Sequence, residues 1–262
     1  MATTLLSPRN EAPEHPGARG AHDKARSPYG LSPIEHCTTC QLRCKSFFCR
    51  VSGALLPEFD RIKSVSSYPE GAVLFMEDEV GRGVYIVCQG RVKLLTTNSE
   101  GKTIIIKIAK PGDLLGLYAT ISGAKLEVTA ETLQPTKLAF VTREDFLRYI
   151  RTHGEACLRM AQHMGRDCHS AYAVIRSIAL SHSVPEKLAR LLMEWTAEAR
   201  ENNGVLRVKL SLTHEELAQL IGCSRESVSR SLGEFRRQRL LELNGSTLLV
   251  HNKAALESLA AI

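Results

Sequence analysis

The sequence predicts an α+β protein with a cysteine-rich N-terminal segment, an antiparallel β-roll, a long dimerisation helix and a C-terminal winged helix-turn-helix domain. Three observations support this fold class. Short β-rich runs separated by turn residues occupy the first half of the chain. A heptad pattern of apolar residues follows them. Two capped helices joined by a glycine turn then come near the C-terminus.

Changes in composition and periodicity divide the 262 residues into five parts. The length itself allows one to two domains with enough chain to bury a core. We expect a disordered tail over 1–30, a cysteine-rich segment over 31–54, a β-roll sensor domain over 55–150, a dimerisation helix over 151–182 and a DNA-binding domain over 183–262.

The charge and the apolar runs limit the possible partners. A net charge of +6 is compatible with nucleic-acid binding. No apolar run reaches the length of a membrane span, and the N-terminus lacks the pattern of a signal peptide. The sequence therefore predicts a cytoplasmic protein that does not bind a membrane. Since that compartment is reducing, the eight cysteines indicate metal or redox chemistry and not a disulfide framework.

Half of the cysteines form one C-x2-C-x3-C-x4-C run. Short loops can turn four such thiolates inward around one metal centre, whereas four unliganded surface thiols would be unusual in this compartment. The compact spacing favours an iron–sulfur cluster of the [4Fe-4S] type. A structural zinc is the alternative, although zinc usually takes two cysteine pairs separated by a longer insert. The predicted ligands are Cys37, Cys40, Cys44 and Cys49, with His36 outside the set.

The β-roll is predicted from four β-rich runs that follow a short helix over Leu55–Ile62. Glycine-containing turns separate the runs, which favours an antiparallel barrel or roll. Cys88 lies inside one run, and we interpret it as a small buried residue rather than a ligand. The runs are Val73–Phe75, Val84–Cys88, Val92–Leu95 and Thr103–Ile108.

A helical period returns from about Thr142, and its apolar residues alternate at spacings of four and three. This is the seam of a two-helix coiled coil, so the predicted partner is the same helix in a second copy. The alternative is a helix that packs only on its own roll. The predicted interface residues are Cys157, Ala161, Met164, Cys168, Ala171, Ile175 and Ile178. A further helix is predicted over Glu186–Glu201, after Pro185.

The last part of the chain predicts a helix-turn-helix. Thr213 and Glu216 form a capping box, and Gly222 supplies the sharp turn to a second helix. That helix has an apolar face of Val228, Leu232 and Phe235. Asn244-Gly245 between two β-rich runs, Leu240–Leu243 and Thr247–Val250, predicts a hairpin that would form the wing.

The opposite face of the second helix carries side chains suited to the major groove. Arginine can pair with guanine, and glutamate can accept from cytosine. The alternative is a solvated, salt-bridged surface helix, but this does not explain the two caps, the glycine turn or the arginines that follow, which are placed to contact phosphates. The predicted DNA-binding residues are Ser224, Arg225, Glu226, Ser229, Arg230 and Arg237.

The order of these parts resembles the cAMP receptor protein/fumarate-nitrate reduction regulator (CRP/FNR) family of bacterial transcription factors. The resemblance covers about residues 55 to 262 and implies that the roll has the cyclic-nucleotide-binding fold. It also places the family's base-reading Glu and Arg on Glu226 and Arg230, with Arg225 and Ser229 at branch-specific positions. The motifs that carry it are Tyr68–Phe75, Val84–Gly90, Gly112–Gly116 and Gly222–Arg230.

The resemblance is closest to the iron–sulfur, oxygen-sensing (FNR-like) branch. The cAMP branch binds its nucleotide with a Gly-Glu-Leu segment and a following Arg, whereas this chain has Gly116-Leu117-Tyr118 and then Lys125 but no Arg. The best-known oxygen-sensing members use a fourth cysteine inside the roll. Here Thr136–Phe140 contains none, and Cys44 is an additional N-terminal thiol. The four N-terminal cysteines therefore form a self-contained set.

The resemblance implies a homodimeric, sequence-specific transcription regulator that binds double-stranded DNA at an inverted repeat and contacts RNA polymerase. Its cluster would sense oxygen, nitric oxide or redox state. The alternative is a small-molecule-gated regulator of the same fold with structural zinc on the cysteines. We do not expect an enzyme, because the sequence has no nucleophile–base constellation and no phosphate-binding glycine loop.

Overall fold

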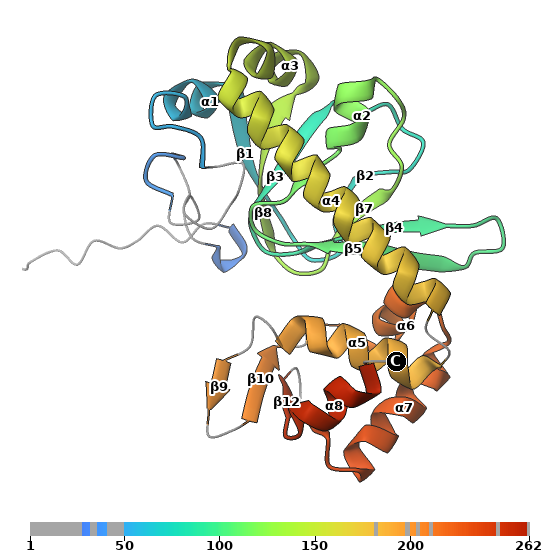
Figure 1. The fold of residues 1–262 in the computed structure, drawn as a ribbon. Coiled ribbons are helices and arrows are strands. Elements are labelled where there is room, and N and C mark those ends of the chain that lie inside the picture. The colour runs from blue at the N-terminus through green and yellow to red at the C-terminus, as the bar shows by residue number, and fades with distance from the viewer. Residues whose placement is uncertain are drawn as a thin grey trace, which may run out of the picture.

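The computed structural model describes residues 28–31, 36–40, 50–180, 183–196, 200–202, 205–209, 212–244 and 247–260. Its N-terminal unit is built on two β-sheets, and its C-terminal unit is mainly helical (Figure 1). One long helix runs diagonally across the first unit and leads into the second (Figure 1). Among the described helices, none is both long and apolar enough to span a lipid bilayer.

The N-terminal unit, which we call the sensor domain after the role that its sequence predicts, contains two four-stranded antiparallel sheets, and so confirms the predicted roll. One sheet, in the order β1-β8-β3-β6, consists of β1 (Lys63–Tyr68), β3 (Gly83–Gln89), β6 (Leu114–Leu115) and β8 (Thr136–Thr142). The other sheet, in the order β2-β7-β4-β5, consists of β2 (Val73–Phe75), β4 (Val92–Thr97), β5 (Thr103–Ala109) and β7 (Thr129–Thr132).

Residues from both sheets share one apolar core, because alternate side chains of each strand point to the same face. This core contains the buried side chains of Phe75, Val87, Val92, Leu115 and Leu138. Burial of these side chains supplies the main driving force for packing one sheet on the other.

Four helices belong to the sensor domain: α1 (Leu56–Ile62), α2 (Leu117–Ser122), α3 (Arg143–Thr152) and α4 (Gly154–Leu180). Thr142 caps α3, since its hydroxyl accepts from the Asp145 backbone N–H at 3.2 Å. α3 ends because His153 adopts an extended conformation, and α4 begins at the next residue. A second core joins α1, α3 and the first turns of α4 to the β1-β8-β3-β6 sheet.

The C-terminal unit, which we call the DNA-binding domain after the role that its sequence predicts, surrounds a separate apolar core. Its helices are α5 (Val184–Thr196), α6 (His214–Ile221), α7 (Arg225–Arg237) and α8 (Lys253–Ala260). Its sheet has the order β11-β12-β10-β9, with β9 (Arg200–Asn202), β10 (Val205–Lys209), β11 (Leu241–Asn244) and β12 (Thr247–Val250). The paired strands β11 and β12 are the predicted wing.

Two sequence predictions differ from the structure. The helix predicted over Glu186–Glu201 is wrong at its end, because Arg200–Asn202 pairs with β10 as strand β9. The tail predicted over 1–30 differs at Pro28–Gly30, which form a short 3₁₀ turn beside β1, followed by the buried Leu31. Residues 1–27 of that tail lie outside the described residues.

The capping box of α6 gives a prediction about stability. Thr213→Ala should lower the free energy of unfolding of the DNA-binding domain by about 0.5–2 kcal/mol, because it removes the hydroxyl that accepts the Glu216 N–H. Trp195 is the single tryptophan and packs on this domain's core, so its fluorescence during urea unfolding reports this domain. Thr213→Ser keeps the hydroxyl and should unfold at the wild-type midpoint. Equal midpoints for both variants would contradict the capping role.

Candidate nucleic-acid interface and cysteine segment

Local hydrogen bonds fix the helix-turn-helix geometry. The Thr213 hydroxyl accepts from the Glu216 N–H at 3.1 Å, and the Glu216 carboxylate accepts from the Thr213 N–H at 2.9 Å. Gly222 ends α6 in the left-handed region, with φ of 67°, which most other residues adopt at a cost. Ser224 then caps α7, because its hydroxyl accepts from the Ser227 N–H at 3.3 Å.

The α7 helix has one buried and one exposed face. Val228, Leu232 and Phe235 are buried in the domain core, as their spacing predicts. The side chains of Arg225, Glu226 and Arg230 are exposed on the first turns. This exposure leaves them accessible to a major groove, and the base contacts predicted for them stay predictions.

The other three predicted DNA-binding residues have partners within the domain. Ser229 is half-buried, and its hydroxyl lies 2.9 Å from His214 Nδ1 of α6. The Ser224 hydroxyl serves as the helix cap, and the exposed Arg237 guanidinium pairs with Glu234. His214 was not predicted as part of this face.

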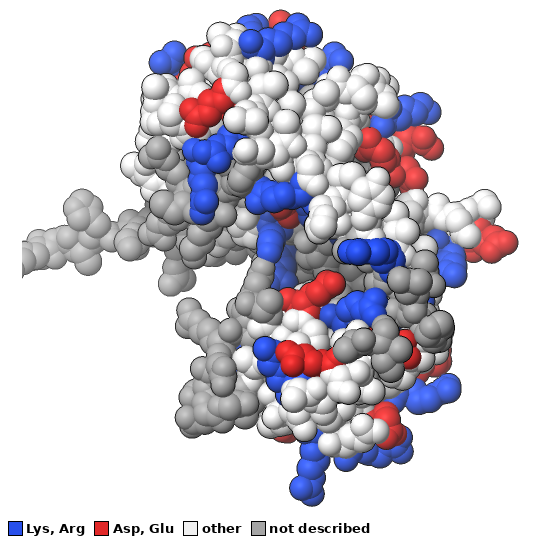
Figure 2. Space-filling model, viewed as in Figure 1, with Lys and Arg blue, Asp and Glu red and all other residues white. Residues whose placement is uncertain are grey.

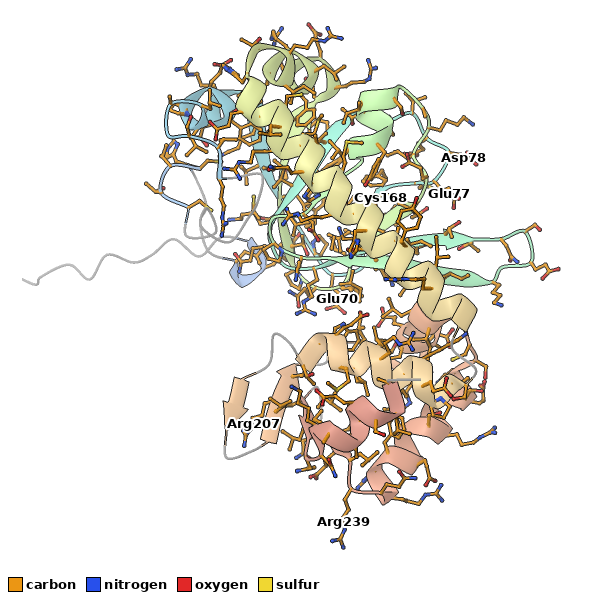
Figure 3. The ribbon with its side chains drawn as sticks, viewed as in Figure 1. Glu70, Glu77, Asp78, Cys168, Arg207 and Arg239 are labelled. Atoms are coloured by element: carbon orange, nitrogen blue, oxygen red, sulfur yellow. The ribbon has the colours of Figure 1, made fainter. Side chains whose placement is uncertain are left out.

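Charge at the DNA-binding face is set by groups on α7 and beyond it. The pKa of Glu226 is lowered, because its carboxylate accepts hydrogen bonds from its own backbone N–H and from Ser224. Basic side chains gather along the lower edge of the DNA-binding domain, with few acidic ones between them (Figure 2). Arg239 projects from this edge beyond the end of α7 (Figure 3). These cations suit contacts to phosphates.

The structure describes two of the four predicted cluster ligands. Cys37 and Cys40 lie on one turn, in which the Cys40 N–H donates to the Cys37 carbonyl at 3.4 Å. Both thiols are half-buried, and Cys37 packs against the second core of the sensor domain. Cys44 and Cys49 lie outside the described residues. Within the described part of the chain, no three His, Cys, Asp or Glu side chains converge as a metal site.

Two charged residues that the sequence analysis missed lie against Cys37. Lys63 Nζ donates to Cys37 Sγ at 3.3 Å, and the Lys63 side chain is only 3% exposed. Asp60 Oδ1 accepts from the Cys37 backbone N–H at 2.8 Å, and Asp60 Oδ2 lies 2.8 Å from His36 Nδ1. Lys63 also donates to Asp60, so the two residues and the Cys37 turn form one network.

Both members of this charged pair are ionised. Burial alone would raise the pKa of Asp60, but hydrogen bonds from Lys63, from the Cys37 N–H and from His36 hold it well below its usual range. Burial alone would lower the pKa of Lys63, but Asp60 and Cys37 raise it above the usual lysine value. A fixed positive charge therefore lies beside the Cys37 sulfur.

The remaining described cysteines lie on other elements of the chain. Cys88 is half-buried on β3 and packs on the sensor-domain core. Cys223 follows the glycine turn of the helix-turn-helix, and burial raises the pKa of its thiol although Lys187 opposes the shift. Cys157 and Cys168 are exposed on α4.

The α4 helix packs on the sensor domain through one face only. Ala156, Met160 and His163 are buried there, and Asp167 accepts from Lys107 of β5 at 2.9 Å. The opposite face carries a second stripe at spacings of three and four, exposed in the single chain. This stripe, which we call the outer stripe, consists of Leu158, Ala161, Gly165, Cys168, Tyr172 and Ile175.

The predicted dimer interface overlaps the outer stripe in part. Ala161, Cys168 and Ile175 belong to both sets, and Cys157 and Ala171 are also exposed. Met164 is half-buried and packs against the sensor-domain core. The Ile178 side chain lies outside what the structure describes. The exposed apolar residues that the sequence analysis missed are Leu158, Tyr172 and Val174.

The segment expected to contact the ribose of a cyclic nucleotide in the cAMP branch has no acidic group at the position of that branch's Glu. Gly116 has a φ of 70° and leads into α2, and the following Leu117 is 1% exposed in the core. Lys125 lies on the surface, 3.9 Å from Asp78. The position of that Glu is therefore occupied by a buried aliphatic side chain, which offers no carboxylate to a ribose.

Two family descriptions match the chain in the same order as its domains. "Cyclic nucleotide-binding domain" matches residues 65–153, and "Crp-like helix-turn-helix domain" matches residues 186–259. The transcriptional activatory protein AadR of Rhodopseudomonas palustris is 28% identical over 86% of this chain and 96% of its own length. The CRP-like cAMP-activated global transcriptional regulator of Mycobacterium tuberculosis is 25% identical over 72% of this chain and 84% of its own length.

The fold is also found among solved structures. FixK2 from Bradyrhizobium japonicum superposes with a TM-score of 0.69 at 22% identity, over 77% of this chain and 98% of that one. A cyclic nucleotide-binding domain followed by a Crp-like helix-turn-helix domain defines a DNA-binding transcription regulator. This chain belongs to the CRP/FNR family of such regulators.

The exposed face of α7 predicts how single arginines contribute to DNA recognition. Arg230→Ala should cost about 1–3 kcal/mol at one base pair of each half-site and relax specificity there. Arg237→Ala, at the end of the same helix, should weaken binding to all sequences alike and reduce the salt dependence. Competition binding with a half-site library at several salt concentrations separates the two effects. Unchanged discrimination at every position in Arg230→Ala would contradict this assignment.

Proposed function

We propose that the chain is a homodimeric regulator whose DNA binding is controlled by a [4Fe-4S] cluster that senses oxygen, nitric oxide or redox state. The proposed ligands are Cys37, Cys40, Cys44 and Cys49. One observation carries this proposal: the Cys37–Cys40 turn is docked on the sensor domain with a buried cation against its first sulfur. Double-stranded DNA with an inverted repeat and RNA polymerase are the proposed partners.

The donor set suits an iron–sulfur cluster. Thiolates bind iron strongly, and the Cys37–Cys40 spacing places two of them on one turn. Half-burial of both thiols limits the access of water to a group held there. Structural zinc on the same cysteines remains the alternative, although a ladder of short spacings is more typical of iron–sulfur ligation.

A cluster held by these cysteines would supply a group that oxygen and nitric oxide degrade. The residues of this chain would hold it, neutralise its charge and connect it to the rest of the sensor domain. Asp60 ties the Cys37 turn to α1, and Lys63 provides the positive charge. Loss of the cluster would break the links between the Cys37–Cys40 turn, which Asp60 and Lys63 hold on the sensor domain, and the other two ligands.

Contacts continue from the Cys37 turn to the start of α4. Asp60 and Phe59 are neighbours on α1, and the Phe59 ring lies 5.4 Å from the ring of Tyr149 on α3. Glu58 Oε2 lies 2.9 Å from His153 Nε2, and the His153 carbonyl accepts from the first turn of α4. This continuity supports control of α4 by the cluster segment, since chains of packed and hydrogen-bonded side chains can carry energetic coupling.

The outer stripe supports a homodimer. Leu158, Tyr172 and Ile175 are 58%, 62% and 59% exposed in the single chain. An apolar stripe at heptad spacing along one helix fits the same stripe of a second copy around a two-fold axis. Such a dimer would present two α7 helices to half-sites about one helical turn apart.

A cyclic nucleotide is disfavoured as the effector. The Mycobacterium tuberculosis relative is described as cAMP-activated. In this chain the key position is Leu117, which is buried, so the charge-assisted partner of a ribose is missing. Leu117 therefore argues against a cyclic nucleotide, and the proposed effector acts on the cysteines.

The cysteine assignment predicts the iron content of variants. Anaerobically reconstituted protein should carry about four irons and four sulfides per chain. Serine at Cys37, Cys40, Cys44 or Cys49 should lower this occupancy, because each variant loses one thiolate. Iron and sulfide analysis with absorbance spectroscopy measures the effect, and exposure to air should change the DNA affinity of the wild type along with its cluster content.

Four further cysteines are matched controls for this experiment. Serine at Cys88, Cys157, Cys168 or Cys223 should leave the iron content unchanged, since these thiols lie on other elements. A colourless wild-type protein with one tightly held zinc would refute the iron–sulfur proposal. A full cluster in the Cys44→Ser variant would refute the ligand set.

The outer stripe predicts the effect of a buried charge. Ile175→Asp should weaken the dimer, because it brings two carboxylates together at the two-fold axis. Ser170→Asp adds the same charge at an exposed position outside the stripe and should leave the dimer intact. Sedimentation at low micromolar concentration measures both variants. If Ile175→Asp sediments entirely as a dimer, α4 is not the interface.

A further inference from the structure

We propose that Asp60 and Lys63 are positioning residues for the first cluster ligand: Asp60 fixes the backbone of the Cys37 turn, and Lys63 offsets the charge on its sulfur. This inference rests on the cluster proposed above. It adds two residues outside the cysteine run, from the end of α1 and the start of β1, to the control of the cluster.

The role of Asp60 follows from three hydrogen bonds. Its carboxylate accepts from the Cys37 N–H at 2.8 Å, lies 2.8 Å from His36 Nδ1, and accepts from Lys63. Two of these donors belong to the cysteine segment, which is 23 positions earlier in the sequence. Because Asp60 lies on helix α1, these hydrogen bonds hold the backbone of the Cys37 turn against that helix. Cys37 is the first proposed ligand in the chain.

The role of Lys63 follows from its burial. Its side chain is 3% exposed, yet its Nζ reaches both Asp60 and Cys37 Sγ. Removing an ammonium from water is costly, and a buried ion pair adds little net stability compared with well-packed apolar residues. An ordinary salt bridge is therefore a weak reason for burying Lys63. Compensation of the negative charge on a ligand sulfur explains the burial of Lys63 better.

Charge near a cluster changes its properties in a known direction. A four-thiolate cluster is negatively charged, and its reduction potential depends on net charge and on hydrogen bonds to the sulfurs. A fixed cation on Cys37 Sγ favours the more negative, reduced state, so removing it should lower the potential. Partners of metal ligands commonly change metal affinity about 10–100-fold when they are removed.

The test compares Lys63→Met with the wild type, both reconstituted anaerobically as full-length protein. Lys63→Met should show a lower midpoint potential and should lose its iron to a chelator at least about 10-fold faster. Lys63→Arg keeps the charge and should restore the potential towards the wild-type value. Lys125→Met, which removes a 66% exposed lysine from the same domain, should behave as the wild type.

A double variant separates the cation from the backbone anchor. Asp60→Asn with Lys63→Met leaves no unpaired charge, and the introduced amide side chain still offers an oxygen to the Cys37 N–H. This variant should fold, which circular dichroism verifies, and its potential should lie between those of the wild type and Lys63→Met. If Lys63→Met alone does not fold, the double variant provides the test of how Lys63 affects the reduction potential.

The outcomes separate this inference from the proposed function. A wild-type protein with a cluster whose potential and iron retention match those of Lys63→Met, or of the double variant, would overturn the inference and leave the cluster intact. A wild-type protein that takes up no cluster would overturn the proposed function itself, and the inference with it.

Discussion

Helix α4 has two apolar faces, and among the residues that the structure describes only one of these faces is covered; this constraint organises the molecule. Ala156 and Met160 are buried against the sensor domain, whereas Leu158 and Tyr172 on the other face are exposed. Exposing a row of large apolar side chains to water along a helix costs free energy. In the proposed dimer, association with a second copy through this face would remove this cost and would also fix the distance between two recognition helices. Dimerisation and DNA recognition would then depend on the same helix.

The sequence predicted correctly those structural features that depend on residues close together in the chain. The capping box, the Gly222 turn and the spacing of Val228, Leu232 and Phe235 all predicted structure correctly, because each depends on neighbouring residues. β1, β7 and β8 were missed. The sequences of β1 and β7 are polar and rich in serine or threonine, and all three strands form through long-range pairing. The seam of α4 was only partly identified because two registers share Ala161, Cys168 and Ile175, and the difference between them depends on which face the sensor domain covers.

Asp60 and Lys63 could not be found from sequence for a related reason. Three positions apart, they resemble an ordinary ion pair at a helix end, which is common and weak on a surface. Only the fold brings the Cys37 turn onto them and buries the lysine. A similar dependence on context explains why the predicted helix did not extend to Glu201, since pairing with β10 provides those residues with backbone partners.

A second connection between the domains runs through Glu216. Its carboxylate caps α6 by accepting from Thr213, and it also lies 3.3 Å from Lys93 of β4, which in turn lies 3.0 Å from Glu131 of β7. α6 lies against β5 as well. Coupling between distant sites typically amounts to about 1–3 kcal/mol, which is the size of a few such partly buried contacts. A shift of the β2-β7-β4-β5 sheet would therefore change the docking of the DNA-binding domain and the cap of the helix that supports α7 together, without a large rearrangement of either domain.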